Sequence, residues 1–327
     1  MFATWTLCGG CTATTSEGVA DAGPTPDQET SVGPEDDAAP PTDTGSAPVD
    51  SGSPTADSGP AGCYREVFDG TVSLADLKGS YDSSKWLATS LEVLRRRYAD
   101  GHGILDAMKS DPQLSEFADK GSWAGLMTSI DTMCHEETHG WDFETSLKTP
   151  GKHAFWLRKD LALEAPTAMG FFARSELVPM LGDSGTAMYD ETYLIGDSGT
   201  DDFVFLADEL NAYINGLACA TALGSEITTT ISFRDGAAAH LYYLQLYLKK
   251  ARTSYATLYA KMKASPEWMK FVRYEWARGH FWTEASKPFP NFGINDKKIW
   301  GKVNLAENLS EIELFTGDKP DVVACKP

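Results

Sequence analysis

The sequence predicts a mainly helical α+β fold with a small β-sheet or hairpin, in a single domain over residues 63–327. Apolar residues recur at helical spacing in several long stretches of this region, whereas the apolar and polar alternation typical of strands is confined to short ones. About 265 residues are enough for one domain with a sizeable core. A sharp change of composition near residue 62 marks where this domain begins.

An acidic spacer precedes the folded part. Residues 12–62 contain ten acidic residues, no Lys or Arg, and almost nothing large and apolar. Such a stretch cannot bury enough surface to offset its chain entropy, so we expect it to be disordered. It carries ten of the 19 net negative charges, which leaves −9 for residues 63–327. That balance argues against nucleic acid as a partner, because neutralising phosphates needs a basic face.

Several helices are expected in the folded part, from the spacing of apolar residues and from start signals. Ser265-Pro266-Glu267 is typical of a helix start. Ser122 can cap a second helix, and Thr200 and Asp201 can cap a third. The expected helices cover residues 84–98, 112–118, 122–139, 202–220, 236–262 and 266–284.

Strands are expected only between residues 150 and 180. Phe155, Leu157, Leu161 and Leu163 alternate with mostly polar neighbours, as in a half-buried strand. Residues 171–178 indicate another short strand.

The segment Gly-Asp-Ser-Gly-Thr occurs twice, at residues 182–186 and 196–200. Gly-Asp-Ser-Gly is familiar around the nucleophile of chymotrypsin-like serine peptidases, but such an enzyme requires an all-β double barrel. This sequence is too helical for that fold. Two copies fourteen residues apart instead indicate a pair of turns.

The pentapeptide His135-Glu136-Glu137-Thr138-His139 falls on the last turns of the helix expected over residues 122–139. Residues four apart on a helix share one face, about 5–6 Å apart, so both imidazoles can reach one metal ion. Neutral imidazoles bind Zn²⁺, and a carboxylate beside the metal, here Glu136, can take a proton from water. We expect Gly140 to end this helix.

This HExxH pattern resembles the zincin metallopeptidases, over short segments of the chain. The resemblance implies a zincin-like catalytic domain with one catalytic Zn²⁺, held by His135 and His139, and with Glu136 activating water. Glu137 departs from the uncharged residue usual in the family. Because an unpaired acid is costly to bury, a match calls for Glu137 to face solvent.

A third ligand must come from elsewhere, since no histidine follows shortly after Gly140. Glu209 is the first candidate: on the helix expected over residues 202–220 it shares a face with Ala212, Tyr213 and Gly216, and the small residues allow close approach to the HExxH helix. This ExxA arrangement is similar to the gluzincin branch, in which a Glu on a second helix completes the site. Further candidates for this ligand are Asp208, Glu191 and Asp142.

A hydrolytic site also needs a donor that stabilises the oxyanion. Tyr213 lies four residues after Glu209 on the same expected helical face. His240 lies on a strongly apolar helix face, where a histidine is more often a hydrogen-bonded core residue. Tyr193 and His280 are further candidates, and the sequence does not separate the four.

The N-terminal segment, residues 1–11, is expected to be the remnant of an export signal. Gly9-Gly10-Cys11 followed by a long spacer resembles the end of a bacterial lipoprotein signal. The resemblance implies export and a lipid anchor at Cys11, which would be the only contact with a membrane, because no later stretch is long and apolar enough to span a bilayer.

The remaining cysteines fit an oxidising compartment. Cys63 and Cys325 stand near the two ends of the folded region, where a disulfide would tie its termini. Cys134 and Cys219 then form a second possible pair, which would join the HExxH helix to the helix of Glu209. Four cysteines allow three pairings, and the sequence does not choose among them.

These expectations combine into an exported, zinc-dependent peptidase that acts on a peptide or protein substrate. Its rival is a non-catalytic surface lipoprotein whose helical domain binds a partner and retains at most a structural metal. Retention of zinc with loss of hydrolysis on Glu136→Gln would distinguish the enzyme from the binding module.

Overall fold

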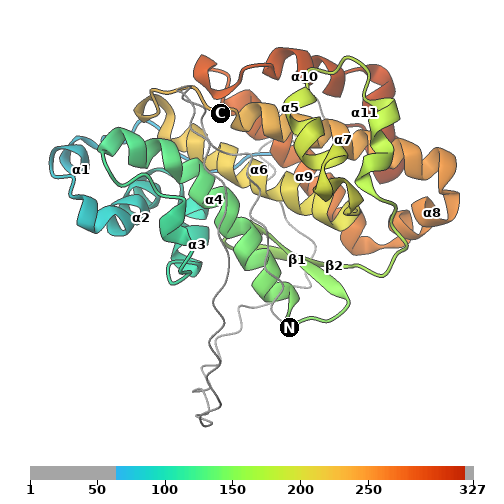
Figure 1. Ribbon diagram of the computed structural model, residues 1–327, viewed down its shortest axis with the longest axis horizontal. Coiled ribbons are helices and arrows are strands. Elements are labelled where there is room, and N and C mark those ends of the chain that lie inside the picture. The colour runs from blue at the N-terminus through green and yellow to red at the C-terminus, as the bar shows by residue number, and fades with distance from the viewer. Residues whose placement is uncertain (1–63, 321–327) are drawn as a thin grey trace, which may run out of the picture. The chain divides into compact units, whose positions relative to one another are not determined.

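The computed structural model describes residues 64–320, which form α-helices and one two-stranded antiparallel sheet (Figure 1). The expected mainly helical fold with a small hairpin is therefore confirmed for this part of the chain. The helices and strands are α1 (Ala75–Gly79), α2 (Trp86–Arg97), α3 (Ala99–Ala107), α4 (Trp123–Ser146), β1 (Lys152–Arg158), β2 (Leu161–Pro166), α5 (Ala187–Asp190), α6 (Phe203–Leu223), α7 (Phe233–Ser254), α8 (Ala256–Ala264), α9 (Pro266–Ala285), α10 (Asp296–Val303) and α11 (Ala306–Thr316).

Three expectations lie outside the described residues. They are the export signal with its anchor at Cys11, the spacer over residues 12–62, and the pairing of Cys63 with Cys325. Within residues 64–320, no helix has the length and apolar character needed to cross a membrane.

Helices α4 and α6 form the centre of the fold and lie side by side (Figure 1). Ser122 caps α4 as expected, its hydroxyl accepting a hydrogen bond from the Gly125 amide at 3.0 Å. The cap of α6 is Asp202 rather than the expected Thr200 or Asp201, because the Asp202 carboxylate is the one that reaches the Val204 amide, at 2.8 Å.

Small side chains and a disulfide hold α4 and α6 together. A Cβ at Gly216 would lie 3.0 Å from the Asp131 carbonyl oxygen of α4 and would clash with the Phe233 ring. Glycine is therefore needed at this crossing. A disulfide between Cys134 of α4 and Cys219 of α6 adds a covalent link, which selects one of the pairings that the sequence left open.

The end of α4 differs from the expectation. The helix runs seven residues past His139 to Ser146, so Gly140 is not its stop. Gly140 serves packing instead, because a Cβ there would lie 3.0 Å from the Met108 side chain. Strand β1 holds the extra turns: the Ser146 hydroxyl accepts a hydrogen bond from the Ala154 amide at 2.8 Å.

The expected strand alternation appears as the β1–β2 hairpin, in which Phe155 pairs with Leu163. The further strand expected over residues 171–178 is wrong, since Arg174–Met180 is a 3₁₀ helix. The amide and carbonyl of Phe172 both bond to the Tyr247 hydroxyl, at 3.0 and 2.9 Å, so they have no need of a strand partner.

Two expected helices are also corrected. The segment 112–118 contains only the 3₁₀ turn Leu114–Glu116, because the Asp111 carboxylate bonds the Gln113 amide and favours a turn. The helix expected over 236–262 begins earlier and is broken at Tyr255 into α7 and α8. The Tyr255 ring stacks on Phe172, with centroids 4.6 Å apart, and this contact fixes the break.

Other helix expectations for this region are borne out. Helix α9 starts at Pro266 with Ser265 as its cap, and α2 lies within the expected 84–98. The first Gly-Asp-Ser-Gly-Thr copy contains bends, and Gly182 and Gly185 have φ of 58° and 86°, whereas most of the second copy forms the 3₁₀ helix Asp197–Thr200. Helix α3 is not predicted by spacing, because Gly101 and Gly103 interrupt it. A Cβ at Gly101 would lie 2.7 Å from the Cys219 sulfur, so α3 passes close to the disulfide.

Candidate metal centre

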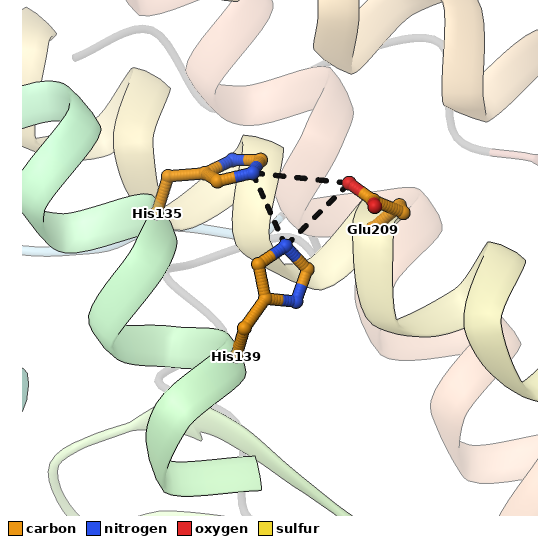
Figure 2. A group of neighbouring side chains, drawn as sticks. All are labelled: His135, His139 and Glu209. Carbon is orange, nitrogen blue, oxygen red and sulfur yellow. Dashed lines mark hydrogen bonds and ion pairs between the residues drawn. The ribbon is translucent and has the colours of Figure 1, made fainter. Parts of the chain in front are cut away.

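His135 and His139 lie one turn apart on α4, and Glu209 faces them from α6 (Figure 2). The two imidazole Nε2 atoms are 3.1 Å apart. Glu209 Oε2 lies 3.8 Å from Nε2 of His135 and 3.5 Å from Nε2 of His139. The structure thus brings together the three residues that the sequence proposed as ligands.

These separations fit a zinc ion. Tetrahedral bonds of roughly 2.0–2.1 Å place ligand atoms about 3.3 Å from one another. Glu209 Oε2 is buried and accepts no hydrogen bond within the described part of the chain, although it points at two imidazole nitrogens. An unsatisfied buried carboxylate oxygen is costly, and a cation between the three groups would satisfy it.

The other carboxylates considered as third ligand have different partners. Asp208 lies on the far side of the His139 ring, where its Oδ2 is 2.6 Å from Nδ1. Asp142 accepts hydrogen bonds from the Trp156 amide at 2.5 Å and from the Asn211 side chain at 2.9 Å. Glu191 is exposed. Glu209 is therefore the carboxylate that completes the group.

Burial and charge together set the protonation of these groups. Burial lowers the pKa of His135 to about 3, so this ring is neutral and its nitrogen lone pair is available. Burial also acts against a charge on His139, but Asp208 and Glu209 outweigh it and raise the pKa of His139 well above its usual range. Burial alone would raise the pKa of Glu209, yet the charge of His139 brings it down to about 2. Glu209 is therefore anionic and His135 neutral, and a bound cation would take the place of the proton that Asp208 and Glu209 otherwise keep on His139.

Glu136 and Glu137 have different surroundings on α4: Glu136 interacts electrostatically with His139 and Glu209, whereas Glu137 lies near Asp111 and Gly140. The Glu136 carboxylate forms no hydrogen bond or ion pair with another residue in the range 64–320, and burial raises its pKa. Glu137 is only 1% exposed and neither of its oxygens has a partner, so the expectation that it faces solvent is wrong. Burial, with the charge of Asp111 next, raises the pKa of Glu137 to about 8. It is mostly protonated near neutral pH, which removes most of the charge cost of burying it.

An aromatic wall closes one side of the centre. The Tyr213 ring packs edge-on against the His135 ring, with centroids 4.6 Å apart, and stacks on the His240 ring, with centroids 4.8 Å apart. The hydroxyls of Tyr213 and Tyr193 are hydrogen-bonded at 2.8 Å. The expected position of Tyr213 beside the ligands is confirmed. Tyr193 joins the same group from the π-helical turn Glu191–Ile195.

His240 is oriented as a hydrogen-bond acceptor towards the site. Its Nδ1 lies 2.9 Å from the Gly236 carbonyl oxygen, so this nitrogen carries the proton. Burial lowers the pKa of His240 to about 4, which leaves the ring neutral and Nε2 without a proton to donate. His280 lies on α9, where its ring packs between those of Trp276 and Trp300.

His153 is a residue near the centre that was not predicted from the sequence. It lies on β1, and its Nε2 is 3.0 Å from Asp208 Oδ1. Asp142, His153 and Asp208 lie close enough together to form a second group of possible ligands. No sequence signal marks His153, because only the docking of the hairpin on α4 and α6 brings it to Asp208.

Comparison with known proteins gave no counterpart: no family model matches the chain, and neither a curated protein nor a solved structure was found to be similar to it.

Proposed function

We propose that the chain is a zinc-dependent peptidase of gluzincin-like type, with a zincin-like catalytic domain. The observation that carries the proposal is the convergence of His135 Nε2, His139 Nε2 and Glu209 Oε2 from two helices, with the Glu136 carboxylate near enough to interact electrostatically with His139 and Glu209. Two histidines and one glutamate are the ligand set of catalytic zinc sites that leave a position open for water.

Different residues of the chain would bind the metal, transfer the proton and stabilise the oxyanion during peptide hydrolysis. When bound, zinc polarises a carbonyl and lowers the pKa of water towards about 7. Glu136 accepts the proton from the attacking water and passes it to the leaving amine, a role that its raised pKa favours. The Tyr213 hydroxyl donates a hydrogen bond to the oxyanion, and His240, which stacks on the Tyr213 ring and could donate from Nε2 only when protonated, is the alternative donor.

The proposal includes location and partner. We infer an exported protein, held at the cell envelope by a lipid on Cys11, that acts on peptides or proteins and not on nucleic acid. The acidic balance of residues 63–327 argues against nucleic acid, and the Cys134–Cys219 disulfide fits an oxidising compartment outside the cytoplasm.

Glu136→Gln tests the function. The amide cannot take a proton, so hydrolysis of a broad library of quenched fluorescent peptides should fall at least about 100-fold, while one zinc per chain is retained. Glu144→Gln, at an exposed acid on the same helix, is the matched control and should keep both. Zinc binding by the native chain without hydrolysis of any library member would instead favour the non-catalytic binding module.

The oxyanion donor has its own test. Tyr213→Phe keeps the ring and removes only the hydroxyl, so turnover should fall by roughly 10²–10³ with zinc content unchanged. Tyr242→Phe also removes a buried hydroxyl, one bonded to the Leu181 carbonyl, and should leave turnover near native. An unaltered rate for Tyr213→Phe, with a large loss for His240→Ala, would transfer the role to His240.

A further inference from the structure

Asp208 connects the metal centre to the β-hairpin. Its Oδ2 accepts a hydrogen bond from Nδ1 of His139 at 2.6 Å, and its Oδ1 accepts one from Nε2 of His153 at 3.0 Å. The three side chains come from α4, α6 and β1, and each is at most 23% exposed. A hydrogen bond to Nδ1 leaves the Nε2 lone pair of His139 free to bind a metal.

His153 is the hydrogen-bond donor to Asp208 Oδ1 among the described residues. Within residues 64–320, no Lys or Arg pairs with this carboxylate, and burial together with the charge of Asp208 raises the pKa of the neighbouring Asp142. Asp142 is itself held by the Trp156 amide and the Asn211 side chain. The Asp142, His153 and Asp208 group is therefore a satisfied hydrogen-bond network, in which each carboxylate oxygen already has a donor.

The fold keeps His153 in register with Asp208. His153 pairs with Ala165 across the hairpin, and its ring packs on that of Phe155, with centroids 4.8 Å apart. The neighbouring amides of Ala154 and Trp156 are bonded to Ser146 and Asp142 of α4. Strand β1 is thus bonded to the HExxH helix at two positions that directly follow His153.

We propose that His153 is a positioning residue of the metal centre. Its Nε2–H holds Asp208 so that Oδ2 faces His139 Nδ1, and this presents His139 Nε2 to the metal. The hairpin thereby sets metal affinity without supplying a ligand. The inference rests on the proposed zinc centre but not on any hydrolytic activity.

Zinc affinity measured against a chromophoric chelator at fixed pH tests the proposal. His153→Phe removes the donor and should weaken binding by about 10–100-fold. His153→Gln restores an N–H near the Nε2 position and should stay within a few-fold of native. Lys152→Ala, at the exposed neighbour on the same strand, should leave affinity unchanged.

A double-mutant cycle separates positioning from general packing. If His153 acts through Asp208, His153→Phe should weaken binding little further once Asp208→Asn is present, whereas independent effects would add. Should His153→Phe not fold, the comparison of His153→Gln with Asp208→Asn gives the same discrimination. Native affinity in Asp208→Asn, or additive losses in the cycle, would overturn the proposal.

Stoichiometry distinguishes the remaining outcomes. One zinc per native chain is expected. Two per chain, one of them lost in His153→Phe, would show that Asp142, His153 and Asp208 form a second metal site and would overturn the positioning role. No zinc in the native chain would refute the centre itself, while zinc binding without peptide hydrolysis would refute only the proposed function.

Discussion

Replacing His139 or Glu209 by alanine should abolish stoichiometric zinc binding near neutral pH. Each supplies one of three directed bonds, and a two-ligand remnant does not hold a catalytic zinc. The Nε2 and Oε2 atoms of these residues lie 3.5 Å apart on different helices. Metal content measured after dialysis of the folded protein checks this expectation.

His102→Ala is the matched control for the ligand variants. His102 lies on α3, outside the centre, so its loss should leave one zinc per chain. One tight zinc in Glu209→Ala would show that the third ligand lies elsewhere. Circular dichroism of each variant establishes that it is folded.

Arg278→Met should lower the free energy of unfolding by about 3–5 kcal/mol. Arg278 on α9 forms an ion pair with Glu66 at 2.7 Å, and both side chains are fully buried. Glu66 also accepts hydrogen bonds from the hydroxyls of Tyr64 and Tyr98, at 2.6 and 2.5 Å. Removal of the cation leaves a buried carboxylate without a countercharge, and urea unfolding at pH 7 measures the cost.

Arg273→Met provides the control for this ion pair. Arg273 lies on the same helix and pairs with Asp318 at 2.6 Å, but the two side chains are 49% and 64% exposed. Water and salt screen such a pair, so its loss should cost less than about 1 kcal/mol. Equal losses in the two variants would contradict the assignment of stability to the buried pair.

The pH dependence of the buried pair follows from Glu66. Burial acts to raise the pKa of this carboxyl, but Arg278 and the tyrosine hydroxyls bring it below its ordinary value of 4.5. A lowered folded-state pKa means that the contribution is present above pH 4.5 and is lost as the pH falls further. The difference between Arg278→Met and the native chain should therefore shrink in acid.

The sequence by itself determined the local parts of the centre. His135 and His139 share a face because residues four apart on a helix are neighbours. The caps at Ser122 and Ser265 follow from their side-chain hydroxyls, which accept hydrogen bonds from amides of the first helical turn. The small residues of α6 also indicated correctly that Glu209 could approach α4, because a glycine at a crossing has a direct steric meaning. These signals involve neighbours within a few residues, or the absence of a side chain.

Only the tertiary structure decided which side chains from distant segments contact one another. Asp208 contacts His139 and His153, which are 69 and 55 residues away, so no local pattern could distinguish its role from that of Glu209. The extension of α4 to Ser146 and the burial of Glu137 likewise depend on β1 and on the segment around Met108. Local spacing fixes the face on which a side chain lies. The packing of distant segments fixes its partners, because hydrogen bonds and charge depend on proximity in space.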